Sequence, residues 1–233
     1  AELEGLHREG LLRPDNIFNH CTALPDAGWK ILREAGVRVN VCPRSDAHYG
    51  IEDGMFAMQS AQRHGISPGL SVDNETSYSG DMFMEMRVAF YLQRVMGMHQ
   101  QRCCGAEHHP VTLPAHGLLK AATLDGATCA GLQDKIGTLA PGKQADLILI
   151  NAQDINLYPS GNAFGTVVHA AERSNVDTVI IGGRIVKRGG KVLGVDSERL
   201  RAAIDESREH LFAAAGYQPD IFAETFMPLE SAK

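Results

Sequence analysis

The chain has 233 residues, of which 44% are hydrophobic and 21% are charged, a composition typical of a globular protein with a sizeable core. Its formal net charge is −6 and no run of lysine or arginine stands out, which argues against a nucleic-acid partner. No stretch of about 18 apolar residues occurs, so we expect no transmembrane helix and no membrane partner.

The N-terminal residues and the cysteines bear on the compartment and on completeness. The first ten residues, AELEGLHREG, contain neither an apolar stretch nor a basic leader, so we expect no secretory signal at this end. Because the chain starts at Ala1 rather than at Met, we expect it to be a fragment of a longer protein. Its five cysteines are an odd number, which favours reduced thiols over a disulfide framework. Together these features predict a cytoplasmic protein.

The first hundred residues alternate between strand and helix patterns. Strands are expected at residues 16–20, 37–42 and 68–73, and helices at residues 25–36, 52–64 and 80–98. The second strand is rich in β-branched residues and is stopped by Pro43, after which a loop is expected through Gly50. Short connections in such an alternation favour a parallel sheet with helical crossovers.

The pattern changes after the third helix. Polar sequence at residues 99–113 predicts a loop, and the Ala- and Leu-rich residues 114–132 predict a helix. Strands are expected at residues 145–150, 176–181, 184–188 and 191–193, with Gly182 and Gly183 forming a hairpin turn. A final helix is expected at residues 197–215. Three βα units cannot close an eight-stranded barrel, so the chain contains either an open sheet or only part of a barrel.

Two polar residues stand at the ends of predicted parallel strands. His20 ends the first strand and Asp73 ends the third, at the face where open α/β sheets and TIM barrels assemble their sites. An imidazole and a carboxylate placed there can bind a metal, orient a water or exchange its protons. The alternative is a histidine packed in the core and an aspartate that caps the next helix.

Five segments, taken in order, resemble the amidohydrolase superfamily, in the branch of cytosine, guanine and S-adenosylhomocysteine deaminases and triazine hydrolases. They are residues 19–21 (NHC), 42–45 (CPRS), 71–73 with 79–87 (SVD, SGDMFMEMR), 122–127 (ATLDGA) and 136–147 (IGTLAPGKQADL). The resemblance implies an α/β fold: the C-terminal portion of a (β/α)8 TIM-like barrel plus part of a small β-sandwich. It divides the chain into barrel strands six to eight with their helices (1–132), sandwich (133–195), and C-terminal helix and tail (196–233).

The resemblance also implies a reaction and a metal. Asp73 would bind one divalent metal, zinc or alternatively iron, and take a proton from the attacking water, while His20 would orient or polarise the reacting group. The expected chemistry is hydrolysis of a C–N bond in a small nitrogen-heterocyclic substrate, most simply a deamination. Four residues in the loops after the second and third strands are expected to contact the substrate: Arg44, Asp46, His48 and Asn74. A plain solvated loop is the alternative for the first three.

Departures from the family pattern leave other possibilities open. No His-x-His motif occurs, and only His7 precedes His20, so most metal ligands are expected outside this chain. Asp46 stands where the family has Asn, and Asn74 where it has Gly. We therefore keep the alternative of a catalytically incomplete half-barrel module, and expect either a missing N-terminal segment or a homo-oligomer to complete the fold.

Minor candidates are a thiol nucleophile and a separate metal site. Cys21 adjoins His20, but as its neighbour along a strand its side chain would point to the opposite face. A Cys/His site would use Cys103, Cys104, His108 and His109, whose spacing matches no standard zinc pattern.

Overall fold

The computed structural model describes residues 2–50, 56–74, 79–105 and 112–218. The chain divides into two compact units, Ala1–Lys191 and Val192–Lys233. The second unit contains helix α9 (Ser197–Ala215), which matches the expected helix at both ends. No helix within the described ranges is long and apolar enough to cross a membrane.

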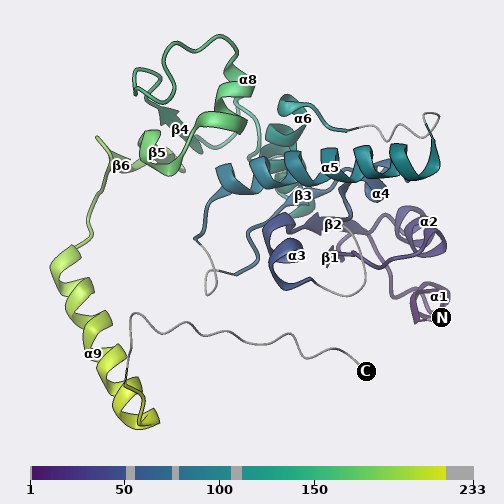
Figure 1. Cartoon of the computed structure of the whole chain (residues 1–233), viewed down its shortest axis with the longest axis horizontal. Coiled ribbons are helices and arrows are strands. Elements are labelled where there is room, and N and C mark those ends of the chain that lie inside the picture. The colour runs from purple at the N-terminus through teal and green to yellow at the C-terminus, as the bar shows by residue number, and fades with distance from the viewer. Residues whose placement is uncertain (1, 51–55, 75–78, 106–111, 219–233) are drawn as a thin grey trace. The chain divides into compact units, whose positions relative to one another are not determined.

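The first unit begins with a parallel three-stranded sheet in the order β1-β2-β3 (Figure 1). Its strands are β1 (Ile17–Asn19), β2 (Arg38–Val41) and β3 (Gly69–Leu70). Helix α1 (Glu2–Arg8) precedes the sheet, and the connections carry α2 (Asp26–Glu34), α3 (Pro43–Tyr49) and α4 (Met58–Arg63). The predicted alternation is confirmed, although β3 has two residues where six were expected. Residues 51–55, part of the predicted third connection, lie outside the described residues.

The loop expected after β2 is a helix, so that prediction was wrong. Pro43 ends the strand but also occupies the first turn of α3, where its fixed φ and missing N–H cost nothing. Gly50, with a φ of 57°, ends the helix in the left-handed conformation. The consequence for the site is that Arg44, Ser45 and Asp46 have fixed positions on a helix.

A long helix, α5 (Met82–Cys104), follows the parallel sheet. The side chain of Asp81 caps it by accepting hydrogen bonds from the backbone N–H groups of Phe83 and Met84, at 3.0 and 3.4 Å. We expected a loop from residue 99, but the helix continues to Cys104, because residues 99–104 contain neither Gly nor Pro and the break comes only at Gly105 (φ 88°).

The helical segment predicted at residues 114–132 is confirmed, with a change of helix type inside it. It consists of α6 (Ala115–Lys120), the π-helical turn η1 (Ala121–Asp125) and α7 (Gly126–Cys129). Gly69 in β3 permits this segment to approach closely, because a Cβ at that position would lie 3.1 Å from the Cα of Gly126.

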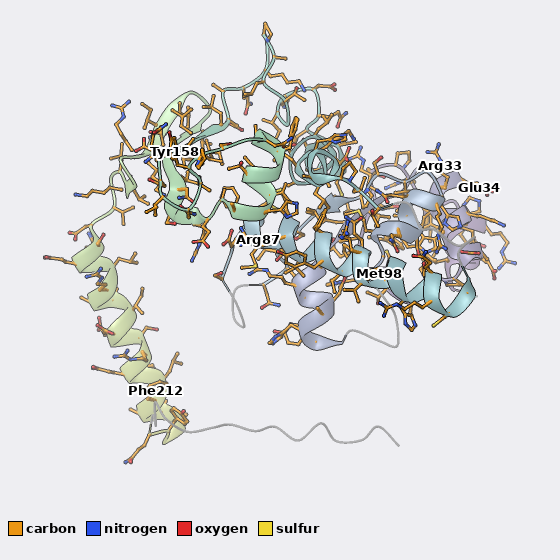
Figure 2. The ribbon with its side chains drawn as sticks, turned by 45° about the horizontal axis from the view of Figure 1, so that its top comes forward. Arg33, Glu34, Arg87, Met98, Tyr158 and Phe212 are labelled. Atoms are coloured by element: carbon orange, nitrogen blue, oxygen red, sulfur yellow. The ribbon has the colours of Figure 1, made fainter. Side chains whose placement is uncertain are left out.

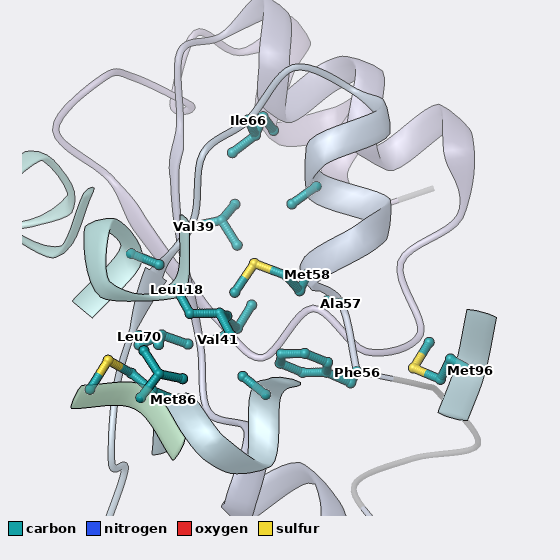
Figure 3. Packing of buried hydrophobic residues seen from close by; sticks show 14 of the residues in the cluster. Val39, Val41, Phe56, Ala57, Met58, Ile66, Leu70, Met86, Met96 and Leu118 are labelled. Carbon is teal, nitrogen blue, oxygen red and sulfur yellow. The ribbon is translucent and has the colours of Figure 1, made fainter. Parts of the chain in front are cut away.

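The core of the first unit lies between the parallel sheet and its helices (Figure 3). Val39 and Val41 of β2 pack with Met58 of α4, Met86 of α5 and Leu118 of α6, each at most 2% exposed. Burying a side chain of this size contributes about 1.5–3 kcal/mol, so these contacts hold the strands in the positions from which the polar residues project.

A second, antiparallel sheet has the order β4-β5-β6-β7. Its strands are β4 (Leu147–Ile150), β5 (Val176–Ile181), β6 (Arg184–Arg188) and β7 (Lys191–Val192). These four strands and the Gly182-Gly183 turn were predicted from the sequence. The connection between β4 and β5 carries α8 (Ala163–Gly165), η2 (Thr166–Ala170) and η3 (Arg173–Asn175), which were not predicted. Arg87 of α5 (Figure 2) reaches this connection and donates to the carbonyl of Ala171 at 2.8 Å.

Candidate active site

The carboxyl ends of β1, β2 and β3 form one edge, and polar side chains gather there. The backbone N–H of His20 donates to the carbonyl of Asn40 at 3.0 Å, which carries the pairing of β1 with β2 one residue further. The N–H of Ser71 donates in the same way to Val41 at 3.0 Å, and Asp73 follows two residues later. The parallel register therefore brings His20 and Asp73 to the same edge of the sheet.

Backbone strain is concentrated at this edge. Within the described ranges, the non-glycine residues with positive φ are His20 (63°), Cys21 (59°) and Asp73 (73°). The left-handed conformation costs a side-chain-bearing residue about 1–3 kcal/mol, and such residues cluster at functional sites. The left-handed residues turn the backbone away from the strand direction at His20 and at Asp73.

His20 is paired with a buried carboxylate from α3. Its Nδ1 lies 2.8 Å from Oδ1 of Asp46, whose side chain is 5% exposed, against 26% for the His20 side chain. Burial raises the pKa of Asp46 above its usual range, the hydrogen bond and charge of His20 oppose this rise, and the charge of Asp73 adds to it. The Oδ2 atom of Asp46 is buried and has no hydrogen-bond partner among the described residues. This is an unpaired acceptor next to the predicted catalytic histidine.

The Asp73 carboxylate is oriented by its neighbours. Its Oδ2 accepts hydrogen bonds from Ser45 Oγ at 2.5 Å and from Asn74 Nδ2 at 3.2 Å. The backbone N–H of Asp73 donates to Ser71 Oγ at 3.3 Å. Asp73 does not cap the next helix, since Asp81 caps α5. One oxygen is therefore held by donors from α3 and the adjacent residue, and Oδ1 makes no hydrogen bond within the described part of the chain.

Arg44 is engaged by a buried glutamate that the sequence reasoning missed. Its backbone N–H donates to Glu85 Oε2 at 3.3 Å, its Nε pairs with Oε1, and its Nη2 donates to the carbonyl of Ser79 at 2.6 Å. The Glu85 side chain is fully buried; burial raises its pKa, and Arg44 opposes the rise through its hydrogen bonds and charge. A signal was present, because Glu85 lies four residues before buried Ala89 and eight before buried Gln93, on the core-facing side of α5.

The remaining predicted substrate residue on α3, His48, lies on the exposed side of that helix. Its ring contacts Tyr49 edge-on, with 4.7 Å between the ring centroids. Asn74, by contrast, lies against Asp73. The structure thus brings four predicted residues to the sheet edge, and these are His20, Asp46, Asp73 and Asn74.

The cysteine alternatives are weakened. Burial, with a contribution from the charge of Asp46, raises the pKa of the Cys21 thiol to about 11. A thiol with that pKa is protonated at neutral pH and is a poor nucleophile. Cys103 lies on α5 with its Sγ 3.6 Å from Nε2 of His99, and Cys104 is the last residue of the same helix. The other two proposed partners, His108 and His109, lie outside the described residues.

The donor atoms at the sheet edge fit part of a metal site. The described ranges contain no group of three or more His, Cys, Asp or Glu side chains that could hold a metal ion by themselves. Asp73 nevertheless offers a carboxylate oxygen, oriented by Ser45 and Asn74 through its other oxygen. The described residues around Asp73 could thus supply one ligand, and any further ligands would have to come from other residues.

Polar side chains at the carboxyl ends of parallel strands occupy the face where TIM barrels build their active sites. The chain belongs to the amidohydrolase family, whose model matches residues 1–186. The resemblance noted in the sequence is therefore confirmed.

Several curated relatives are deaminases. The chain is 34% identical over 207 residues to the 5-methylthioadenosine/S-adenosylhomocysteine deaminase of Desulforudis audaxviator. This match covers 88% of this chain and 45% of that protein. It is 32% identical over 191 residues to the 5'-deoxyadenosine deaminase of Methanothermobacter thermautotrophicus, which covers 82% of this chain and 42% of that protein. The chain thus spans less than half the length of these relatives.

Solved structures agree with the family fold. An adenosine deaminase from Xanthomonas campestris with bound zinc superposes with a TM-score of 0.78 at 28% identity, covering 91% of this chain and 46% of that one. The atrazine chlorohydrolase of Arthrobacter aurescens, complexed with zinc, gives a TM-score of 0.75 at 19% identity, covering 87% and 43%. At 19% identity the second likeness concerns the fold alone. The described structure is therefore part of an amidohydrolase-type barrel fold.

Proposed function

We propose that the protein carrying this chain is a metal-dependent aminohydrolase that removes an amino group from a nitrogen heterocycle of a small molecule. The observation that carries the proposal is the Asp73 carboxylate, held by Ser45 and Asn74 at the same sheet edge as His20. Support for deamination comes from the relatives, which are named as deaminases of adenosine-type compounds. An adenine-like ring is accordingly the first substrate class to test.

Each polar residue at the edge has a role in this proposal. Asp73 would hold one divalent metal, zinc or alternatively iron, together with ligands from outside this chain; that metal supplies Lewis-acid chemistry and lowers the pKa of water. Asp73 Oδ1 makes no hydrogen bond with the described residues, so it is the atom that would accept a proton from the attacking water. His20 would orient or polarise the reacting group.

The substrate would contact the loops and the helix around this edge. Arg44, Asp46, His48 and Asn74 remain our predicted contacts. Arg44 and Asp46 are already engaged by Glu85 and His20, so they would act on the substrate through fixed positions. Asn74 adjoins Asp73 and is the nearest of the four to the proposed metal ligand.

The rest of the fold would come from outside this chain. We propose that residues 1–132 form the last part of the barrel, that residues 133–195 form part of a small β-sandwich, and that residues 196–233 form a C-terminal helix and tail. A preceding segment of the same protein, or a second copy of it, would complete the barrel and supply the missing metal ligands. Because the five cysteines are free, the protein would work in the cytoplasm.

The alternative function is a half-barrel module that binds no metal and serves folding or assembly. The observation favouring it is that no group of three or more possible metal ligands occurs among the described residues. Metal content separates the two functions, because the enzyme binds about one metal ion per protomer of the complete protein and the module binds none.

The test is the substitution Asp73→Ala in the complete protein. We expect the variant to lose its metal, measured by elemental analysis, and to lose ammonia release from adenosine-type substrates by at least about 100-fold, because a metal ligand and a proton acceptor disappear together. The matched control is Asp15→Ala, which removes an exposed carboxylate that pairs with Arg13 at 3.2 Å. Full metal content and full turnover in Asp73→Ala would contradict the assignment.

A further inference from the structure

The buried carboxylate of Asp46 is placed to control the imidazole of His20. The backbone N–H of Asp46 donates to the carbonyl of Cys42 at 2.9 Å, which fixes the start of its side chain in the first turn of α3. The backbone N–H of His20 donates to the carbonyl of Asn40 at 3.0 Å, and the φ of 63° at His20 sets the direction in which its side chain leaves the backbone. Both partners of the 2.8 Å contact are therefore anchored independently of each other.

The chemistry of the contact determines which ring nitrogen carries the proton. An ionised carboxylate can only accept hydrogen bonds, so Asp46 Oδ1 requires a proton on Nδ1 of His20. A neutral imidazole with Nδ1 protonated has its lone pair on Nε2. The His20 side chain is 26% exposed whereas that of Asp46 is 5% exposed, so the ring is the more accessible of the two groups.

We propose that Asp46 is a positioning residue that holds His20 with Nδ1 protonated, so that Nε2 is the atom that takes up and returns a proton during the reaction. The attacking water gives its first proton to Asp73, as proposed above, and its oxygen bonds to the ring carbon; that first proton then passes to the ring nitrogen. The Nε2 lone pair takes the second proton from the resulting C–OH group, which makes His20 an imidazolium. As the C=O bond forms and the C–N bond breaks, Nε2 returns this proton to the departing amine. The Nδ1–H bond to Asp46 stays intact throughout. The role of Asp46 on His20 stands on geometry, and only the identity of the reaction rests on the proposed function.

Four other ionisable side chains lie around the Asp46 carboxylate. Asp73 faces Asp46 from the end of β3, while Cys42 and Cys21 face it from the ends of β2 and β1. Glu85 faces it from α5, but Arg44 lies against Glu85 and offsets its charge. The charge nearest to the ring is Asp46 itself, so a proton gained at Nε2 is balanced by a carboxylate at hydrogen-bond distance.

The test reads the tautomer of His20 directly. The complete protein is labelled with 15N-histidine, freed of metal by a chelator so that no metal ion can impose the tautomer, and studied by long-range 1H–15N correlation at a pH where the ring is neutral. Wild type, Asp46→Asn and Asp46→Ala are compared, with the His20 signals assigned by His20→Gln. Asp26→Asn is the matched control, because Asp26 is an exposed carboxylate 3.6 Å from Nε2 of His64.

We expect His20 to be protonated on Nδ1 in the wild type and in Asp46→Asn, whose amide oxygen can still accept the hydrogen bond. In Asp46→Ala the two tautomers should mix, and Asp26→Asn should leave the His20 signals unchanged. A wild-type His20 protonated on Nε2, or an Asp46→Ala spectrum identical to wild type, overturns the proposal. If Asp46→Ala does not fold, the wild-type and Asp46→Asn spectra still decide.

Turnover separates this proposal from the proposed function. In the zinc-loaded protein, Asp46→Ala should lower kcat by on the order of 100-fold, the scale of one proton-transfer group, with little change in KM. Asp46→Asn should recover part of that loss. A wild-type protein that releases no ammonia from adenosine-type substrates refutes the proposed function, whereas the tautomer measurement still supports or overturns the role of Asp46.

Discussion

At the scale of single residues, the sheet edge combines buried carboxylates with strained backbone, both of which cost stability. Asp46 and Glu85 are buried acids whose pKa values are raised by desolvation. His20 and Asp73 occupy left-handed conformations. Natural proteins keep such destabilising features where a site needs the geometry. Replacing one of these acids should therefore raise the unfolding free energy where only its burial cost is removed, and lower it where a buried charged partner loses its counter-charge.

The unfolding free energy of Asp46→Asn should increase relative to that of the wild type as the pH rises. The pKa of Asp46 is higher in the folded protein than its ordinary value of 3.8, so its contribution to stability is fully present below that value. This contribution is lost as the pH rises through the folded pKa, because burial disfavours the charged form. The uncharged variant lacks this loss.

Urea denaturation of both proteins between about pH 4 and about pH 7 measures this difference. The difference in unfolding free energy should shift in favour of Asp46→Asn across that range. His20→Gln should steepen the pH dependence, because it removes the hydrogen bond and charge that lower the pKa of Asp46. A difference that does not vary with pH would show that burial does not penalise the Asp46 carboxylate.

Glu85→Ala should destabilise the protein by about 3–5 kcal/mol, since it leaves the Arg44 guanidinium, whose side chain is only 10% exposed, without its carboxylate. The shift in denaturation midpoint measures the loss. Lys120→Ala is the control, because Lys120 is 49% exposed and pairs with Asp125 near the surface. The control should cost less than about 1 kcal/mol. Equal effects in the two variants would contradict the burial argument.

At the scale of elements, α5 is joined to the following segment by one buried amide. Gln93 Nε2 donates to the carbonyl of Leu113 at 2.8 Å, and Gln93 Oε1 accepts from the N–H of Leu113 at 2.7 Å. Gln59 of α4 donates in turn to the backbone carbonyl of Gln93 at 3.1 Å. The Gln93 side chain thus satisfies the N–H and the carbonyl of Leu113, a residue that lies in no helix or strand.

Gln93→Leu should cost about 2–4 kcal/mol of unfolding free energy, because two backbone groups lose their partners in a buried environment. Met98→Ala, at a position of the same helix that is 50% exposed (Figure 2), should change stability by less than about 0.5 kcal/mol. Thermal or urea denaturation of both variants compares them. A Gln93→Leu variant as stable as wild type would mean that water replaces the lost hydrogen bonds.

The sequence predicted those elements whose signals are local. Strand β5 and helix α9 match the prediction at both ends, because turn glycines and a capping aspartate mark their boundaries. Helix α3 was missed because Pro43 is compatible both with ending a strand and with starting a helix. The π-helical turn η1, which packs against β3, has no local signal in the sequence.

The candidate site was predictable in part for the same reason. Parallel pairing brings strand ends together whatever the details, so the sequence could place His20 and Asp73 at one edge. The contacts of Ser45 with Asp73 and of Glu85 with Arg44 join residues 28 and 41 positions apart. Such contacts depend on how the helices pack on the sheet. Residue type and spacing in the sequence do not specify that packing.

At the scale of the whole molecule, the first unit contains an apolar groove of about 700 Å³ that its described residues leave open. The groove is bordered by the first turns of α5, by residues 119–123 and 136–139, and by β4 and β5. Phe83, Leu147 and Val179 are among its lining residues. The chain spans less than half the length of its relatives, so the proposed preceding segment is the natural cover for this surface.

Residues 1–233 expressed alone should therefore bind the dye ANS several-fold more strongly than the complete protein, because an open apolar groove takes up the dye and a covered one does not. In the short form, Leu147→Ser should weaken the dye fluorescence, since Leu147 lines the groove. Ile155→Ser is the control, because Ile155 is 97% exposed and is not among the lining residues. Equal dye binding by the two lengths would mean that the rest of the protein does not cover this groove.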